Sequence, residues 1–377
     1  MGSNGELPST SSRPWVETPL IRSAPLSRAA GCNIYLKLET LQPSGSFKSR
    51  GIGNLMSQAI MQHGPEKPIR FYCSSGGNAG LACATAALAL DRPATIVVPL
   101  ATSSFMVEKL RALDADVQQV GAHWSEADAF LRNSLLGPDP NGVYVPPFDH
   151  PDIWAGNGTI VDEVEEQMQD VPGGYDALVC SVGGGGLLAG LVEGLERHAR
   201  LTSSASSAHQ LLEGSNNPPG NKKPQVLGVE TDGASSLALS LRNGTLSTLP
   251  TITSIATSLG ATRVAPHVFS LTQTYPDHIA SVVVSDAEAA MASVYFADDT
   301  RMIIEVACGA SVAVAYNSPM LRKVLFPGCS DEEFRSKNVV VVVCGGSNVS
   351  LQVLDEYRRK YQDDERVLGA FGKRAVI

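Results

Sequence analysis

One lysine lies where the chain passes from a loop of small residues into a helix-forming run. Lys48 follows Pro43-Ser44-Gly45-Ser46-Phe47 and precedes the run 52–61. The first turn of a helix offers unpaired N–H groups and a partial positive charge. That charge disfavours an ammonium and favours the neutral amine, which attacks carbonyl carbons. Taken alone, Lys48 is a candidate nucleophile, with a solvated surface lysine as the alternative.

Two glycine-rich loops follow strand-like segments. The loop 74–80 reads Ser-Ser-Gly-Gly-Asn-Ala-Gly, and the loop 181–187 reads Ser-Val-Gly-Gly-Gly-Gly-Leu. Each precedes a helix-forming segment, and strand–loop–helix units of this kind bind anions through backbone amides. Four consecutive glycines cost conformational entropy, which indicates that a ligand approaches the backbone closely. The GxGxxG spacing of a dinucleotide site, with its downstream acid, is not cleanly present.

Together with Lys48, these loops resemble the fold type II pyridoxal-phosphate enzymes, and among them the eukaryotic L-serine/L-threonine dehydratases. The resemblance extends from about Thr18 to Leu354 and includes five ordered motifs. These are Tyr35-Leu36-Lys37, Pro43-Ser44-Gly45-Ser46-Phe47-Lys48, Pro146-Pro147-Phe148-Asp149, the four-glycine loop and Cys344-Gly345-Gly346-Ser347-Asn348.

The resemblance implies an α/β fold with two open parallel-sheet domains, similar to the β subunit of tryptophan synthase. The cofactor is expected in the cleft between the domains, where loops leave the carboxyl ends of strands. The large cofactor-binding domain is expected over 15–45 and 151–360, and the small domain over 46–150. Residues 1–14 and 361–377 are expected to be tails, and 201–224 a surface insertion.

Lys48 is implied as the catalytic residue. Its amine is expected to hold pyridoxal phosphate covalently and, once released, to abstract the substrate's α-proton. Phe47 is expected to pack on the cofactor ring, with an ordinary core aromatic as the alternative. The main-chain N–H groups of Gly183, Gly184, Gly185, Gly186 and Leu187 are expected to bind the cofactor phosphate.

Substrate contacts are implied for the first glycine loop. Ser75, Gly76, Gly77, Asn78 and Ala79 are expected to bind the substrate carboxylate, because charge-assisted hydrogen bonds to a carboxylate are strong. The Asn78 amide is also expected to bind the cofactor's phenolic oxygen. Ser74 fits either a substrate contact or a turn.

Cys344 is implied as the partner of the cofactor's pyridine nitrogen. A neutral thiol there gives a weaker electron sink than an aspartate, which suits rapid elimination. The alternative is a buried structural cysteine.

A monovalent cation, K⁺, is implied at Gly183, Glu230, Ala234, Leu259 and Ala261, because hard cations prefer carbonyl and carboxylate oxygens. The seven histidines show no pairing that suggests a metal or a catalytic base.

Composition limits the class of protein. The 377 residues suit one or two domains with a sizeable core, and 43% hydrophobic with 18% charged residues is ordinary for a globular protein. A net charge of −9 without a basic block argues against nucleic acid as partner. The apolar runs are too short for a membrane span. Seven cysteines without a CxxC pair favour reduced thiols and a cytoplasmic location.

Hydrophobic periodicity predicts regular alternation of strands and helices, which indicates parallel sheets covered by helices. Residues 138–149 are interpreted as a link. The predicted strands are 33–38, 70–73, 94–99, 117–120, 177–182, 226–230, 281–284 and 339–344. The predicted helices are 52–61, 78–90, 104–113, 125–136, 154–168, 187–200, 235–241 and 286–298.

The function that follows is β-elimination from L-serine, with L-threonine as a second substrate, giving a 2-oxo acid and ammonia. A small amino acid is the expected partner, and a homodimer the expected assembly. The competing hypotheses are a β-replacement synthase of the same fold, a non-catalytic homologue that binds the cofactor, and a nicotinamide oxidoreductase. No domain for feedback control by isoleucine is expected after the catalytic part.

One residue departs from the family pattern. Serine dehydratases of the liver type read Ser-Ser-Ala-Gly-Asn, whereas this chain has Gly76 in place of the alanine. The missing methyl group is expected to leave extra room near the substrate and extra backbone freedom in the loop. Gly76→Ala is therefore expected to raise kcat/KM for serine and the serine-to-threonine ratio, if residue 76 has a negative φ.

Overall fold

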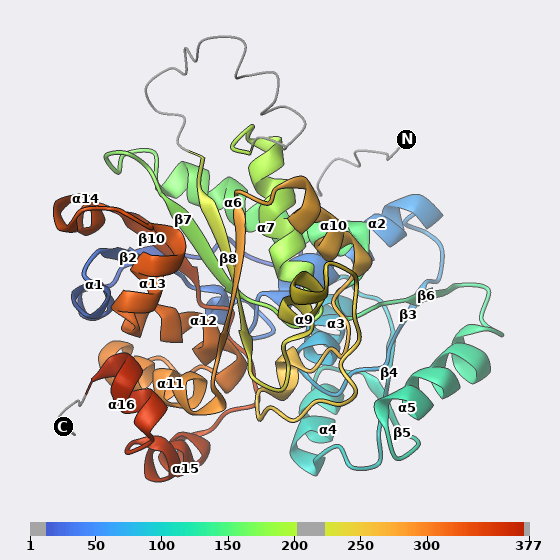
Figure 1. Ribbon diagram of the computed structural model, residues 1–377. Coiled ribbons are helices and arrows are strands. Elements are labelled where there is room, and N and C mark those ends of the chain that lie inside the picture. Colours follow the sequence, from blue (N-terminus) through green and yellow to red (C-terminus); the bar gives the residue numbers. More distant parts are fainter. Residues whose placement is uncertain (1–12, 202–222, 373–377) are drawn as a thin grey trace. The chain divides into compact units, whose positions relative to one another are not determined.

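A computed structural model describes residues 13–201 and 223–372 (Figure 1). The predicted tail 1–14 and insertion 201–224 lie almost entirely outside the described residues. The chain divides into two compact units. Within the described residues, the first unit comprises residues 13–17 and 41–157, and the second comprises residues 18–40, 158–201 and 223–372.

The first unit contains a four-stranded parallel sheet in the order β5-β4-β3-β6. Its strands are β3 Arg70–Cys73, β4 Ala94–Val98, β5 Asp116–Gln119 and β6 Gly142–Tyr144. Its helical segments are α2 Lys48–His63, α3 Asn78–Ala89, α4 Ser104–Arg111, α5 Trp124–Phe130, the π-helix Leu131–Leu136 and the start of α6 Pro151–Gln167.

The second unit contains a six-stranded sheet in the order β1-β2-β10-β7-β8-β9, parallel except for the antiparallel pair β1–β2. Its strands are β1 Leu20–Arg22, β2 Asn33–Lys37, β7 Ala177–Ser181, β8 Gln225–Thr231, β9 Ile279–Val284 and β10 Asn338–Val342. Its α-helices, beside the rest of α6, are α1 Ala24–Ala30, α7 Gly186–Arg197, α9 Ser236–Asn243, α10 Pro266–Thr274, α11 Asp286–Thr300, α12 Val306–Tyr316, α13 Ser318–Leu325, α14 Asp331–Arg335, α15 Leu351–Tyr361 and α16 Glu365–Phe371. Short 3₁₀ turns occur at Glu39–Leu41 and Thr257–Leu259.

The predicted α/β class with two parallel-sheet units is confirmed, and every predicted strand and helix overlaps an observed one. The strand β10 shows why the sheet signal is strong. Its five residues are all buried, and it is a central strand that pairs with β2 on one side and β7 on the other. A central parallel strand covered on both faces has a continuous apolar sequence.

Two interpretations of the sequence need correction. The link 138–149 contains β6, which pairs with β3 and adds a fourth strand to the first sheet. Part of the expected tail 361–377 is the helix α16, which Asp364 caps at its N-terminus. Its Val367 is buried, and the Phe371 ring lies 5.9 Å from the Tyr316 ring. Aromatic packing therefore fixes α16 despite the charged sequence around it.

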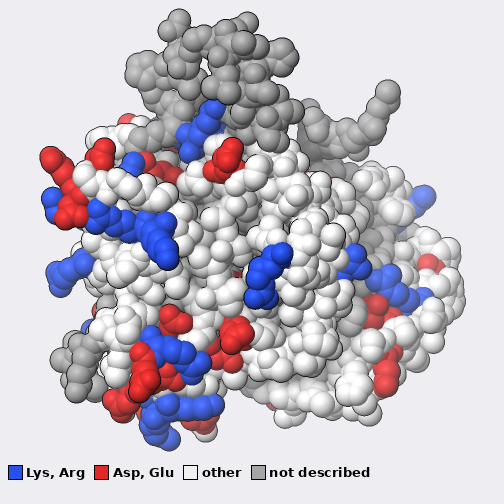
Figure 2. All heavy atoms as spheres, in the orientation of Figure 1, with Lys and Arg blue, Asp and Glu red and all other residues white. Residues whose placement is uncertain are grey.

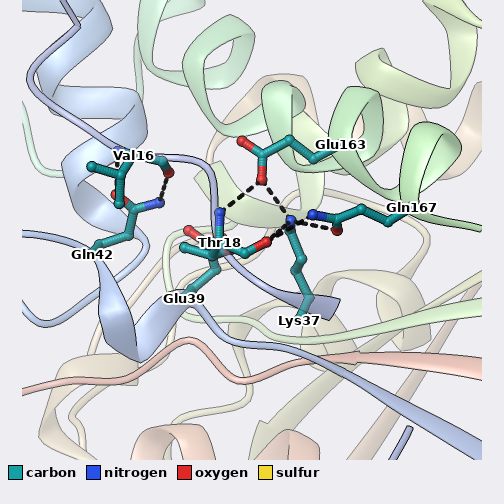
Figure 3. Close-up of polar contacts among 7 residues, drawn as sticks. All are labelled: Val16, Thr18, Lys37, Glu39, Gln42, Glu163 and Gln167. Carbon is teal, nitrogen blue, oxygen red and sulfur yellow. Dashed lines mark hydrogen bonds and ion pairs between the residues drawn. The ribbon is translucent and has the colours of Figure 1, made fainter. Parts of the chain in front are cut away.

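A buried lysine anchors the first strands of the second unit (Figure 3). The Lys37 side chain is fully buried and its Nζ donates to Glu163 Oε2 at 2.5 Å, Gln167 Oε1 at 2.9 Å and Thr18 O at 2.6 Å. Thr18 Oγ1 donates to the buried Glu39 at 2.6 Å. Removing one partner of such a pair leaves a buried charge and costs about 3–5 kcal/mol. The lysine of the Tyr-Leu-Lys motif therefore fixes β2 against α6.

The surface is of mixed charge. On the face drawn in Figure 2, acidic and basic side chains are interspersed among uncharged residues. Within residues 13–201 and 223–372, no helix combines the length and the apolar character that crossing a bilayer requires.

Candidate active site

Lys48 is the first residue of α2, three residues after the end of a tight turn. The turn is closed by the Gly45 N–H, which donates to Gln42 O at 2.7 Å. Ser49 Oγ donates to Ser44 Oγ at 2.8 Å and fixes the loop to the first turn of the helix. Helix and loop thus hold the Lys48 backbone from both sides, as a residue that must place its amine accurately requires.

The Lys48 amine is half-buried and contacts one carbonyl oxygen and one aromatic ring. Its Nζ donates to Pro147 O at 2.8 Å and lies 5.0 Å from the centroid of the Phe47 ring. The Pro147–Phe148 segment is itself held by Trp154, whose Nε1 donates to Phe148 O at 3.0 Å. The two sequence motifs Ser-Phe-Lys and Pro-Pro-Phe-Asp therefore meet at this amine.

The loop after β3 is held in place by an acid, Asp128, that was not predicted from the sequence. Ser74 is buried, and its Oγ donates to Asp128 Oδ1 at 2.6 Å. Tyr144 and Arg132 also donate to Asp128, at 2.9 and 2.8 Å. Burial raises the pKa of Asp128, but these hydrogen bonds outweigh it and lower that pKa below its usual range. Ser74 is thus a structural contact of the loop, and the spacing of Asp128 and Arg132 on a helix is its only sequence signal.

The rest of this loop keeps its polar groups near the start of α3. Ser75 Oγ accepts from the Gly77 N–H at 3.3 Å, and Asn78 and Ala79 are buried in the first turn of α3. A methyl group on Gly80 would lie 1.8 Å from Ser75 O, so the loop closes on the helix only with glycine there. Gly76 lies at a crowded position, because a methyl group added to it would lie 2.9 Å from Thr102 Cγ2. The expectation of extra room at Gly76 is therefore wrong, because the side chains of Thr102 and Val98 occupy that space.

The four-glycine loop joins β7 to α7 in the second unit. Gly185 has a φ of 89° and precedes the first residue of α7. A methyl group on Gly183 would lie 2.9 Å from Leu259 Cα, and Ala265 N donates to Gly184 O at 3.0 Å. Leu187 is buried in the first turn. Neighbouring residues therefore pack closely against the loop, and the N-terminal turn of α7 follows it, which suits a phosphate.

Cys344 follows the end of β10 and is buried. Interaction with the Cys308 thiol, then burial and the charge of Glu305, raise the pKa of Cys344 well above its usual value. The Ser181 hydroxyl at the end of β7 lies near this thiol, is buried, and makes no hydrogen bond of good geometry within the described residues. Cys344 is thus a neutral thiol beside an unsatisfied hydroxyl, at the ends of two adjacent strands.

The predicted cation ligands fall into two groups. Gly183 and Leu259 lie side by side, and Ala261 N donates to Leu259 O at 2.7 Å. Glu230 is fully buried at the end of β8, and its two carboxylate oxygens accept from the N–H groups of Leu237 and Ala238 at 2.8 and 2.7 Å. Burial raises the pKa of Glu230 to about 7, although these amides lower it. The carboxylate therefore caps the first turn of α9.

Ala234 lies on the turn that follows β8, where its N–H donates to Thr231 O at 2.9 Å. Among the residues that the structure describes, no three His, Cys, Asp or Glu side chains group as ligands of a metal ion. The cation predicted from the sequence would be held mainly by carbonyl oxygens, so the absence of grouped side chains neither supports nor contradicts it.

This chain belongs to the family of pyridoxal-phosphate dependent enzymes, whose pattern matches residues 12–345. A human protein named serine dehydratase-like is 42% identical over 340 residues, covering 90% of this chain and 92% of its own. A catabolic L-serine/threonine dehydratase of Saccharomyces cerevisiae is 37% identical, covering 90% and 89%. The crystal structure of an L-serine ammonia-lyase from Rhizomucor miehei matches with a TM-score of 0.78 and 36% identity, covering 92% and 99%.

The residues of this chain fit the cofactor. Lys48 supplies an amine at a helix start, and the loop Gly183–Gly186 supplies glycines of which Gly183 and Gly185 leave no space for a side chain. Cys344 supplies a buried neutral thiol, and Ser181 a buried hydroxyl that lacks a good partner among the described residues. An amine in the first unit, and glycine amides and a neutral thiol in the second, are each of the chemical type that suits one part of pyridoxal phosphate: its aldehyde, its phosphate and its ring nitrogen.

Proposed function

We propose that this chain is a pyridoxal-phosphate dependent L-serine ammonia-lyase that also accepts L-threonine. It releases ammonia and the 2-oxo acid, pyruvate from serine and 2-oxobutanoate from threonine. The observation that supports this proposal most directly is the Lys48 amine, held half-buried at the start of α2 within the Ser-Phe-Lys motif. The identity of 37–42% to relatives named as serine or serine/threonine dehydratases supports the substrate class.

In this proposal Lys48 holds the cofactor by its amine and afterwards takes the proton from the substrate's α-carbon. When bound, the cofactor withdraws electron density from that carbon. The N–H groups of Gly183–Leu187 bind the phosphate, and Phe47 contacts the ring. The loop 75–79 binds the substrate carboxylate, and its Asn78 orients the ring through the phenolic oxygen. The Cys344 thiol contacts the pyridine nitrogen and leaves it without a full positive charge.

Further assignments extend the proposal. Residues 46–150 form the small domain, and residues 15–45 with 151–360 form the large cofactor-binding domain. Potassium binds at Gly183, Glu230, Ala234, Leu259 and Ala261. The protein acts as a homodimer in the cytoplasm.

The first prediction tests Lys48. Purified protein is expected to be yellow and to release 2-oxo acid from serine without an added thiol. Lys48→Ala is expected to lose the visible absorption of the bound cofactor and all measurable turnover, since the base alone contributes roughly 10²–10⁴-fold. Lys109→Ala is the matched control, because Lys109 also lies over a phenylalanine ring, at 5.5 Å, but on α4.

Three results contradict the proposal. Turnover by Lys48→Ala excludes the role of Lys48. Product formation that needs an added nucleophile indicates a β-replacement synthase instead. Bound cofactor without release of ammonia from serine, threonine or other β-hydroxy amino acids indicates a non-catalytic homologue.

The second prediction tests the cation. Activity and cofactor retention are expected to be higher in potassium chloride than in tetramethylammonium chloride. Glu230→Gln is expected to weaken this dependence, because it removes the charge while keeping an oxygen that can accept from α9. Equal activity of the parent protein in both salts, at equal ionic strength, removes the cation from the proposal.

A further inference from the structure

The segment after β10 is shaped around one acid of another helix. Gly345 and Gly346 have φ angles of 80° and 112°, in the left-handed region that favours glycine. A methyl group on Gly346 would lie 2.0 Å from Glu305 Cδ. The Asn348 N–H donates to Glu305 Oε2 at 3.2 Å. The loop 344–348 therefore runs directly over the Glu305 carboxylate, which is only 3% exposed.

Glu305 precedes a helix that cannot easily move. All eleven residues of α12, Val306–Tyr316, are buried. Ser293 Oγ of α11 donates to Glu305 O at 3.4 Å, and Ser311 Oγ donates to Cys308 O at 2.9 Å. A methyl group on Gly309 would lie 2.1 Å from Ala289 O, so α12 packs directly against the backbone of α11. Close packing of this kind makes the first turn of α12 a rigid support.

The same turn reaches the Cys344 thiol. Cys308, one turn after Glu305, is fully buried, and Ser311 Oγ of the same helix lies 3.5 Å from Val342 O, two residues before Cys344. The start of α12 thus lies against the end of β10 as well as against the loop. Interaction with the Cys308 thiol is the main cause that raises the pKa of Cys344, with the charge of Glu305 adding to it and the Ser181 hydroxyl opposing it.

We propose that Glu305 and Cys308 are positioning residues, which hold the Cys344 side chain and the loop 344–348 in the orientation that contacts the cofactor ring. The inference rests on the proposed function, because Cys344 has a ring contact only if the cofactor binds there. The Glu305 carboxylate fixes the loop through the Asn348 amide, and Cys308 fixes the thiol. Neither residue touches the reacting atoms.

The test is cofactor binding to apoprotein, measured by titration with pyridoxal phosphate and by the visible absorption band of the product. Glu305→Ala removes the acceptor of the Asn348 amide and is expected to weaken binding about 10- to 100-fold, as loss of a hydrogen bond to a charged group does. It is also expected to shift the absorption band, because the Cys344 thiol would change its orientation toward the ring. Glu305→Gln keeps an oxygen acceptor and is expected to restore binding to within about threefold of the parent protein.

Glu288→Ala is the matched control. Glu288 is also a buried acid of the second unit that accepts backbone and hydroxyl groups at a helix start, but it caps α11 through Ser285. Its loss is expected to lower the melting temperature of the apoprotein while leaving cofactor affinity and the absorption band unchanged. Cys308→Ala serves as the second arm, with an expected band shift and unchanged backbone contacts of the loop.

Unchanged cofactor affinity and an unchanged band in Glu305→Ala overturn the role of Glu305. Equal losses in Glu305→Gln and Glu305→Ala overturn it as well, because the acceptor is then not what matters. If Glu305→Ala does not fold, Glu305→Gln and Cys308→Ala decide: a Cys308→Ala protein with the parent band overturns the support of the thiol. A parent protein that binds no pyridoxal phosphate contradicts the proposed function itself, whatever the variants do.

Discussion

The loops after β3 and β7 both join a buried parallel strand to a helix, yet their glycines meet different demands. In the loop after β7, Gly185 has a φ of 89°, and a methyl group there would lie 2.6 Å from Val268 Cγ2. In the loop after β3, neither Gly76 nor Gly77 has a positive φ. At Gly185 the loop after β7 needs glycine for its backbone conformation as well as for space, whereas at Gly76 the loop after β3 needs it for space alone.

The difference matches the anion that each loop is proposed to bind. A phosphate is bound by successive backbone N–H groups, and such a loop needs at least one residue in the left-handed conformation, which glycine adopts at low cost, as Gly185 does. A carboxylate can be bound by a side-chain hydroxyl and fewer amides, so the loop after β3 keeps Ser75 and Asn78. Its shape is then fixed by neighbours, notably Asp128 behind Ser74.

The largest effect is expected for Gly185→Ala. The alanine combines an unfavourable φ with a clash against Val268, and strain of this kind costs about 1–3 kcal/mol before the clash is counted. Cofactor affinity, measured by titration of apoprotein, is expected to fall at least about tenfold. Gly244→Ala is the control, because Gly244 has a φ of 65° but no atom within 4 Å of the added methyl group. Equal cofactor affinity in the two variants would contradict the comparison, because it would show that the conformation of Gly185 does not affect cofactor binding.

An intermediate effect is expected for Gly76→Ala. The condition on φ is met, but the added methyl group would lie 2.9 Å from Thr102 Cγ2 and 3.2 Å from Val98 Cγ1. The structure therefore reverses the gain expected from sequence: kcat/KM for serine is expected to fall by roughly fivefold, within the 1–3 kcal/mol of a methyl-sized misfit.

Adding Thr102→Ser to the Gly76→Ala protein removes the carbon nearest to the added methyl group and is expected to recover most of the loss in kcat/KM. The four proteins of the cycle, assayed with serine and threonine, give the coupling between the two positions. An additive cycle would show that Gly76 acts on the loop by some route other than Thr102.

The smallest effect is expected for Gly77→Ala. Gly77 has a φ of −103°, and the nearest atom to an added methyl group is Ser75 Oγ at 3.9 Å. Serine kcat/KM is expected to stay within about threefold, and the unfolded chain loses backbone freedom worth about 0.4–1 kcal/mol. A large rise in KM with unchanged kcat would instead place the Cβ of residue 77 in the space of the substrate carboxylate.

The sequence alone predicted the parts that are local in the chain. Alternating apolar segments located the strands, and glycine and serine after strands located both loops. Lys48 at a helix start was recognisable for the same reason, because strand, loop and helix are consecutive residues. A resemblance over ordered motifs then supplied the cofactor and the reaction class.

Other elements had no local signal. The helix α12 is apolar on every side, so its sequence shows no amphipathic period, and α16 is charged but held by contacts of Phe371 with distant rings. The strand β6 is three residues long within a proline-rich segment. Each exists because of the surface it packs against, which a local pattern does not contain.

The supports of the site were decided by tertiary structure for the same reason. Ser74 is joined to Asp128 across 54 residues, and Asn348 to Glu305 across 43. A serine in a loop or an acid before a helix has the same sequence whether or not such a partner exists. Which of them supports the chemistry follows only when the fold brings distant residues within hydrogen-bonding distance, because those bonds depend on positions in space rather than on order along the chain.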